Sequence, residues 1–149
     1  SASAQATLGE IAAVVAEIGN ADASHRQRLV ALSRLAKAIT TSAAEHSLVA
    51  MDALSRTRGL ATVRAFCDAA PPDDVHVLGS ALALFANVCF QGHTHAVVDA
   101  GVPRLLARLL APPPGQPPAT NPQVVAFAVA AINNLCADLV REREDFFPY

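Results

Sequence analysis

The chain has 149 residues, about the length of one domain, and 52% of them are apolar, which is enough for a continuous core. That composition excludes an intrinsically disordered chain as the default. The formal net charge of −2 and the isoelectric point near 6.2 give no overall electrostatic reason to bind nucleic acid or an anionic membrane, because both favour basic surfaces.

Apolar residues three and four apart, separated by clusters of Gly, Pro, Asn and Asp, predict an all-helical chain. Four helices are expected in the first half, over residues 8–18, 25–39, 43–54 and 60–67. The predicted N-caps of the first three are Thr7, Ser24 and Ser42, because their hydroxyls can accept from free N–H groups. Glu10 and Glu45 stand three residues after two of these caps, which is the spacing of a capping box.

Four more helices are expected over 74–90, 95–100, 103–110 and 122–138. Asp73 is the predicted N-cap of the first, and Gln91-Gly92 its stop. Pro103 and Pro122 suit first helical positions, where no N–H is needed, and Asn121 caps the last helix. The segment 111–118 contains five prolines and predicts an exposed polyproline-type loop, interpreted as a spacer in preference to a docking peptide.

No secretory signal opens the chain, and no uninterrupted apolar run approaches the roughly 20 residues of a membrane span. We therefore expect an intracellular protein of the cytoplasm, or of the nucleus, without a membrane partner. The start at Ser1 without methionine is compatible with a piece of a longer polypeptide. The aromatic end at 146–149 implies either a missing neighbour or a cap that folds back.

The sequence gives little support for a disulfide, a metal site, a catalytic nucleophile or a phosphate-binding loop. The three cysteines, Cys67, Cys89 and Cys136, match no disulfide or metal spacing and are expected to be free thiols packed in the core. His93 and His95 would point to different faces of a helix start, which disfavours a metal site. Cys89 lies in an apolar helix, unlike a reactive thiolate, and no glycine-rich phosphate loop is present. We expect no enzyme activity, no metal, no cofactor, no small-molecule substrate and no nucleic-acid partner.

The chain contains an internal repeat. Residues 81–89 and 128–136 align without a gap at a spacing of 47 residues (81 to 128), and both segments have helical composition. A period in the forties is typical of stacked helical units, in which each unit covers the apolar face of its neighbour. Such arrays favour a binding function over catalysis.

The run from 81 to 110 begins with a helical segment, 81–89, that carries Asn87, and continues with a turn at Asp99-Ala100-Gly101 and paired leucines over 105–110. This run resembles an armadillo repeat, in which a short first helix ends in an acidic-Ala-Gly turn and a long third helix carries an Ala-Leu-x-Asn-Leu pattern. A weaker copy at 31–36 has Arg34 in the asparagine position, 53 residues before Asn87 (34 to 87), and lacks the turn glycine.

The resemblance implies an all-α, armadillo-like right-handed superhelix, an α-solenoid of about three repeats. Its expected organisation is a single helical domain over 1–149. Within it we distinguish a degenerate N-terminal repeat or cap, a first unit, a second unit, and a tail or the start of a further repeat, at 1–40, 41–91, 92–138 and 139–149.

The resemblance also implies a concave groove lined by the third helices, where an asparagine holds the backbone of an extended peptide. The groove candidates are Arg34, Lys37, Ala83, Asn87, Phe90, Ala130 and Asn134. Ala83 and Ala130 stand where nuclear-import members of the family place tryptophans. Because this chain has no tryptophan to stack on lysine stems, binding of nuclear localisation signals is not expected.

Structural roles for these candidates stay open. Asn87 and Asn134 could instead hydrogen-bond between helices. For Arg34 and Lys37 a solvated face is favoured over ligand contact, and for Phe90 packing in the core or capping of the helix end is favoured.

The sequence thus predicts a non-catalytic interaction module or scaffold that binds a protein or an extended peptide. The alternatives are an armadillo-like adaptor, such as a small-GTPase regulator, that uses its convex face or edge, and an architectural piece that forms oligomers through its end faces.

Overall fold

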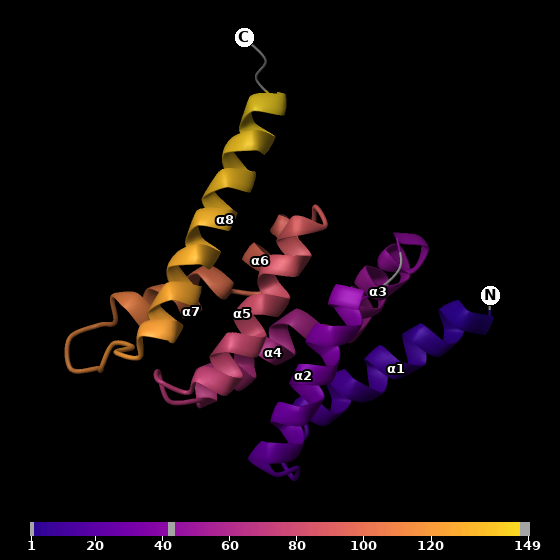
Figure 1. The fold of residues 1–149 in the computed structure, drawn as a ribbon, viewed down its shortest axis with the longest axis horizontal. Helices are drawn as coiled ribbons and strands as arrows, with labels where there is room; N and C mark the ends of the chain where they lie inside the picture. Colours follow the sequence, from indigo (N-terminus) through magenta and orange to yellow (C-terminus); the bar gives the residue numbers. More distant parts are fainter. Residues whose placement is uncertain (1, 42–43, 147–149) are drawn as a thin grey trace.

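A computed structural model describes residues 2–41 and 44–146 of the chain. Within these residues the structure confirms the all-α class: it contains eight helices and no strand (Figure 1). Their bounds are α1 (Ala2–Ile18), α2 (His25–Thr41), α3 (Ala44–Thr57), α4 (Gly59–Ala69), α5 (Val75–Phe90), α6 (Thr94–Asp99), α7 (Val102–Leu110) and α8 (Pro122–Phe146).

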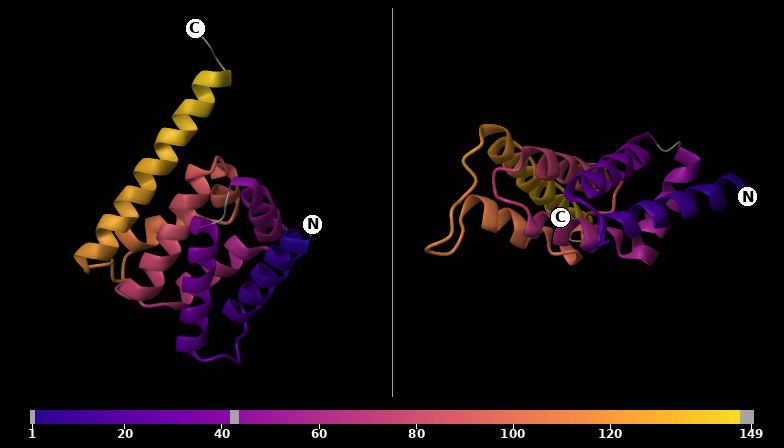
Figure 2. Two further views of the ribbon diagram at one scale, coloured as in Figure 1. Left: turned by 45° about the vertical axis from the view of Figure 1, so that its right-hand side comes forward. Right: turned by 90° about the horizontal axis from the view of Figure 1, so that it is seen from below.

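Four of the helices pack in series, α1 against α2, α2 against α5, and α5 against α8 (Figure 1). The other four fill in around them: α3 and α4 contact α1 and each other, α4 also contacts α5 and α7, and α6 contacts α5, α7 and α8. The left view of Figure 2 shows α1 and α8 at opposite sides of the molecule, with the C-terminal part of α8 projecting beyond the other helices. The helices α2, α5 and α8 are therefore successive neighbours, although each is separated from the next by two shorter helices.

One buried apolar cluster contains residues from all eight helices. The position of each helix explains its sequence pattern. Helix α7 buries a single stripe with i, i+3, i+4, i+7 spacing, at Val102, Leu105, Leu106 and Leu109. Helix α5 lies between α2 and α8 and buries eight apolar residues, so its sequence is apolar on more than one face.

The first helix begins at Ala2, so the expectation that Thr7 caps a helix beginning at Leu8 was wrong. Thr7 lies inside α1, where its hydroxyl donates to the carbonyl oxygen of Ser3 at 3.0 Å. The reason is the alanine content of the preceding segment, since alanine has the highest helix propensity and extends the helix past the hydroxyl residue.

The cap of α2 confirms the prediction at Ser24. The backbone N–H of Gln27 donates to the Ser24 Oγ at 3.1 Å, and the Ser24 N–H donates to the Gln27 Oε1 at 2.8 Å. This reciprocal pair is a capping box. A capping box was also expected at Ser42 and Glu45. The structure describes neither Ser42 nor the side chain of Glu45, so this expectation lies outside the described part of the chain.

Asp74 caps α5, so the expectation that Asp73 does so was wrong. The backbone N–H of Val77 donates to the Asp74 Oδ1 at 3.1 Å. Asp73 binds the segment before α8 instead: its carboxylate accepts from the N–H of Thr120 at 2.6 Å, the hydroxyl of Thr120 at 2.8 Å and the N–H of Asn121 at 2.7 Å. Both aspartates satisfy the local capping rule, and the distant segment decides between them.

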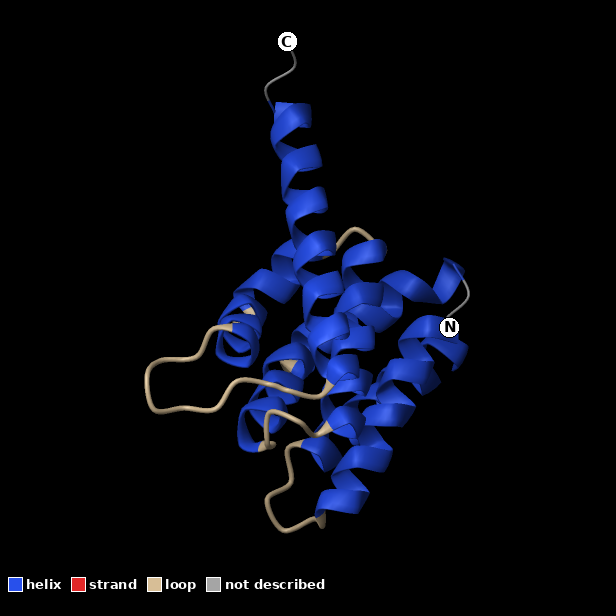
Figure 3. Cartoon of the chain, turned by 60° about the vertical axis from the view of Figure 1, so that its left-hand side comes forward, coloured by secondary structure: helices blue, strands red, loops and turns tan. Residues whose placement is uncertain are grey.

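The proline-rich segment is a loop that protrudes from the helices (Figure 3). It turns back on itself, because the N–H of Gln116 donates to the Pro113 carbonyl at 3.1 Å and Gly115 has a φ of +90°. The loop is therefore a turn and not one continuous polyproline helix. Asn121 then caps α8 through its Oδ1, as predicted, and α8 continues to Phe146, past the expected end at 138.

Candidate functional site

The predicted groove residues lie on the three helices expected to line the groove. Arg34 and Lys37 are on α2, Ala83, Asn87 and Phe90 are on α5, and Ala130 and Asn134 are on α8. All are exposed except Asn87, which is half-buried. The structure thus leaves most of this set accessible to a partner.

Asn87 cross-links two helices, which is the structural role left open in the sequence. Its Nδ2 donates to the Thr40 Oγ1 on α2 at 3.0 Å, and the Thr40 hydroxyl donates to the carbonyl oxygen of Ala36 at 2.8 Å. Thr40, and not Arg34, therefore meets Asn87 from α2. Residues on one face of a helix recur every three or four positions, so several turns of α2 carry a similar apolar pattern. The similarity of segment 31–36 therefore does not determine which turn of α2 lies beside Asn87. Asn134 on α8 is exposed.

Phe90 is 90% exposed, so the expectation that it packs in the core or at the helix end was wrong. The next residue makes the interhelical contacts instead. The Nε2 of Gln91 donates to the carbonyl oxygen of Ile39 at 3.2 Å, and the hydroxyl of Ser47 donates to the Gln91 Oε1 at 2.6 Å. Gln91 joins α5 to α2 and α3, a role that its position in a predicted helix stop did not reveal, and the Phe90 ring is left on the surface.

The cysteines differ from one another. Cys67 and Cys89 are buried, as expected, but Cys136 is exposed, so its placement in the core was wrong. Burial raises the pKa of the Cys67 thiol to about 12. Burial also raises the pKa of Cys89, a shift that the hydrogen bond with Thr94 opposes and the charge of Asp138 reinforces. In both buried cysteines the raised pKa favours the thiol over the thiolate, which is the nucleophilic form.

Thr94 is the one buried polar residue among those that the structure describes, and it links α6 to α8. Its hydroxyl donates to the Asp138 Oδ2 at 2.9 Å. The described side chains contain no group of three or more His, Cys, Asp and Glu residues placed to hold a metal ion. His93 and His95, which flank Thr94 in sequence, belong to no such group.

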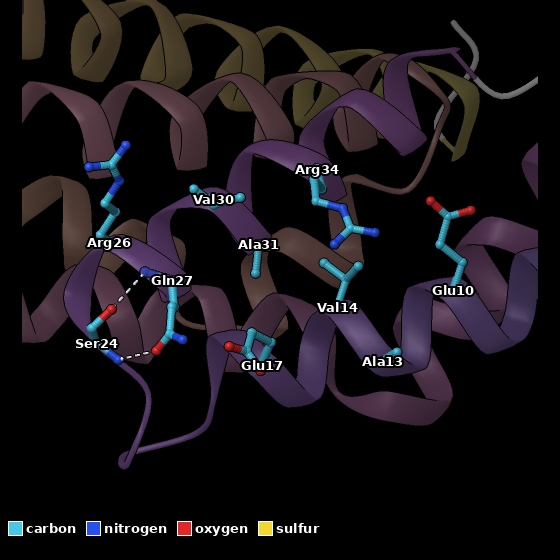
Figure 4. A pocket seen from close by; sticks show the side chains of 10 residues that line it. All are labelled: Glu10, Ala13, Val14, Glu17, Ser24, Arg26, Gln27, Val30, Ala31 and Arg34. Carbon is cyan, nitrogen blue, oxygen red and sulfur yellow. Dashed lines mark hydrogen bonds between the residues drawn. The ribbon is translucent and has the colours of Figure 1, made fainter.

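A cavity of about 540 Å³ opens between α1 and α2 (Figure 4). Of the seven groove candidates, Arg34 alone lines it. A second cavity of about 480 Å³ lies among α3, α4 and α6, where Leu48 is 73% exposed beside Met51 and Leu60. The sequence did not predict either cavity, because each is formed where separate helices pack together.

Helix α8 contains a segment, Pro122–Val140, that is long and apolar enough to cross a membrane by length and composition alone, with a mean hydropathy of 1.6. The sequence pattern did not predict such a segment, because Asn133, Asn134 and Asp138 interrupt the apolar run. One face of the segment is buried, at Val124, Ala128, Ala131 and Leu135. Core helices of soluble proteins satisfy the same criterion, so the segment is weak support for a membrane span.

Comparisons with known protein families, with curated proteins and with solved structures find no match to this chain.

Proposed function

We propose that this chain is a non-catalytic interaction module, built as a short armadillo-like right-handed solenoid of about three repeats, that binds a protein or an extended peptide inside the cell. One observation carries the proposal. The two copies of the internal repeat lie on α5 and α8, which pack directly against each other, and α2 packs on the other side of α5. Long helices at regular intervals in a row are what a stack of repeat units requires.

A second feature supports the equivalence of the units. The residue before α4, Arg58, has a left-handed backbone conformation with a φ of 54°, and the residue before α7, Gly101, has one with a φ of 85°. In both proposed units, the turn between the first two helices therefore contains one residue with a left-handed backbone conformation. The first unit uses an arginine where the second uses the glycine that such a conformation favours.

The proposed binding face is the exposed side of α2, α5 and α8. It exposes small apolar residues at Ala83 on α5 and Ala130 on α8, the aromatic ring of Phe90 on α5, and the positive charge of Arg34 on α2. Asn134 is the residue best suited to hold a peptide backbone, because its exposed amide offers both a donor and an acceptor. Asn87 already uses one N–H on Thr40 and contributes less.

A specific observation favours the alternative, a piece that assembles through an end face. Helix α8 exposes Val129 and Val140 on the side opposite its buried residues, with 45% and 56% of each residue accessible. An end face of this kind is normally covered by a further repeat or a second copy. This alternative predicts a molecular mass in light scattering that rises with protein concentration, and a constant monomer mass contradicts it.

The groove is tested by affinity capture with the immobilised chain and with its Asn134→Ala variant. The adjacent exposed residue gives a matched control, since Asn133 lies about 100° around the helix from Asn134. We expect Asn134→Ala to lose the captured protein and Asn133→Ala to retain it, with both variants melting within a few degrees of wild type. Equal capture by the two variants contradicts the groove.

A further inference from the structure

The cavity between α1 and α2 has two walls of opposite charge. Glu10 and Glu17 stand on α1, seven residues apart, and Arg26 and Arg34 stand on α2, eight residues apart. Each spacing is about two helical turns, roughly 11 Å along the axis, so each wall carries two like charges on one helix face. Figure 4 shows these side chains around the opening, with the capping pair Ser24 and Gln27 at one end.

The floor between the walls is apolar. Val14 and Ala31 are buried, while Val30 is 51% exposed and Ala13 is exposed. The small side chains leave room for a helix to approach closely, and Val30 exposes apolar surface that a partner would bury. A cavity of about 540 Å³ with this lining matches the apolar stripe of a helix more closely than it matches an ion.

The four charges have no ion-pair partner within the described part of the chain. The ion pairs there join other residues, such as Arg56 with Asp52 and Arg64 with Asp68. The charges of the cavity rim are therefore available to a partner that carries the complementary charges.

We propose that the cavity between α1 and α2 is a docking site for an amphipathic α-helix of another protein. That helix would carry an apolar stripe, a basic flank that faces α1 and an acidic flank that faces α2. Because the two flanks differ in sign, such a helix fits with one chain direction only. The site is separate from the proposed face of α2, α5 and α8, although Arg34 borders both.

The charges argue against a second copy of this chain as the occupant. Its most exposed apolar helix is α8, whose apolar part, 122–140, carries one charged residue, Asp138, while the mixed charges at 141–145 follow that part along the axis instead of flanking it. That segment cannot match two acidic and two basic residues at once. A partner with both signs of charge on its helix meets the requirement.

Three helical peptides test the proposal, each with the same Ala/Leu stripe and an i,i+4 staple on the polar face. The first has one Lys flank and one Glu flank, the second has two Lys flanks, and the third has two Glu flanks. The proteins are the wild type, Glu10→Lys/Glu17→Lys, Arg26→Glu/Arg34→Glu and the control Arg104→Glu, an exposed residue of α7 outside the groove. Circular dichroism checks that each protein is folded, and fluorescence anisotropy measures the dissociation constants.

We expect the mixed-flank peptide to bind the wild type and the control about tenfold more tightly than either single-sign peptide. The Glu10→Lys/Glu17→Lys protein should prefer the all-Glu peptide, and Arg26→Glu/Arg34→Glu the all-Lys peptide. Binding to the wild type should weaken in 0.5 M salt.

The same peptide ranking on all four proteins overturns the proposal, as does an absence of binding to the wild type at about 1 mM peptide. If a double variant does not fold, the ranking and salt dependence on wild type still decide. Asn134→Ala should leave peptide binding unchanged. Failure of the site between α1 and α2 is therefore distinguishable from failure of the proposed binding face of α2, α5 and α8.

Discussion

The carboxylate of Asp73 holds Thr120 by two hydrogen bonds, from the backbone N–H at 2.6 Å and from the hydroxyl at 2.8 Å. Asp73 stands just before the cap of α5, and Thr120 just before the cap of α8, 47 residues later. The N–H of Asn121 donates to the same carboxylate at 2.7 Å. One side chain therefore fixes the start of α8 beside the start of α5.

Asp73→Asn should make the stability of the protein less dependent on acid pH. The N–H of Asn121, then the Thr120 hydroxyl and the Thr120 N–H, lower the pKa of Asp73 below its ordinary value. A lowered folded-state pKa means that the stabilisation is present above the unfolded-state pKa of about 3.9 and is lost as the pH falls through the folded-state pKa. We expect the difference in melting temperature between wild type and variant to be largest at pH 6 and to shrink toward pH 2.5. The control is Asp22→Asn, in the exposed turn after α1. A difference that does not change with pH contradicts the charged role of Asp73.

Asn87 and Thr40 should be energetically coupled. Removal of their hydrogen bond by Asn87→Ala is expected to lower the free energy of unfolding by about 1 kcal/mol, the usual net contribution of such a bond. In a double-mutant cycle with Thr40→Ala, urea denaturation should give a coupling energy of about 0.5–1 kcal/mol. Asn134→Ala serves as the comparison and should change stability by less than about 0.5 kcal/mol, because Asn134 is exposed. Strictly additive effects at Asn87 and Thr40 would show that the bond contributes nothing.

Thiol labelling of the native protein should be limited to one cysteine. Cys136 is exposed, Cys89 is buried with a raised pKa, and the pKa of buried Cys67 is about 12. We expect one thiol per chain to react quickly with an aromatic disulfide reagent at pH 8, and three after denaturation. Cys136→Ser should abolish the fast reaction, whereas Cys89→Ser should leave it in place. Fast reaction of a second thiol would mean that α5 or α4 opens readily.

Arg58→Gly should stabilise the fold. Arg58 is the one non-glycine residue with positive φ in the described ranges, and a left-handed backbone costs a residue with a Cβ about 1–2 kcal/mol. Glycine removes that cost, although it also gains freedom in the unfolded chain, so a net gain of about 1 kcal/mol is expected in urea denaturation. Arg58→Ala controls for loss of the side chain and should give no gain, because alanine keeps the Cβ.

Local rules predicted the helices well and their partners poorly. The caps at Ser24 and Asn121 and the break at Gly101 follow from neighbouring residues, and the structure places them as expected. Asp73 and Asp74 are equally good caps by sequence, and contact with Thr120 separates their roles. That contact depends on how α5 and α8 pack.

Burial was the least predictable property, for the same reason. Cys89 and Cys136 occupy equivalent positions in the repeat, yet one is buried and the other exposed. Helix α5 has neighbours on both sides, and α8 has α5 on one side. In the cavity, the two-turn spacing of Glu10 with Glu17 and of Arg26 with Arg34 is visible in the sequence, but it does not show that the two pairs face one another.

The proline-rich loop also determines where the chain tolerates added length. Its far end is anchored by the N–H of Ala119, which donates to the carbonyl oxygen of Leu109 at 2.8 Å, and by the bonds of Thr120 to Asp73. The turn around Gly115 lies outside both anchors, so extra residues there cost only the slowly growing entropy of a longer loop. A fluorescent reporter domain inserted between Gly115 and Gln116 would thus label the protein and leave the packing of α7 against α8 intact.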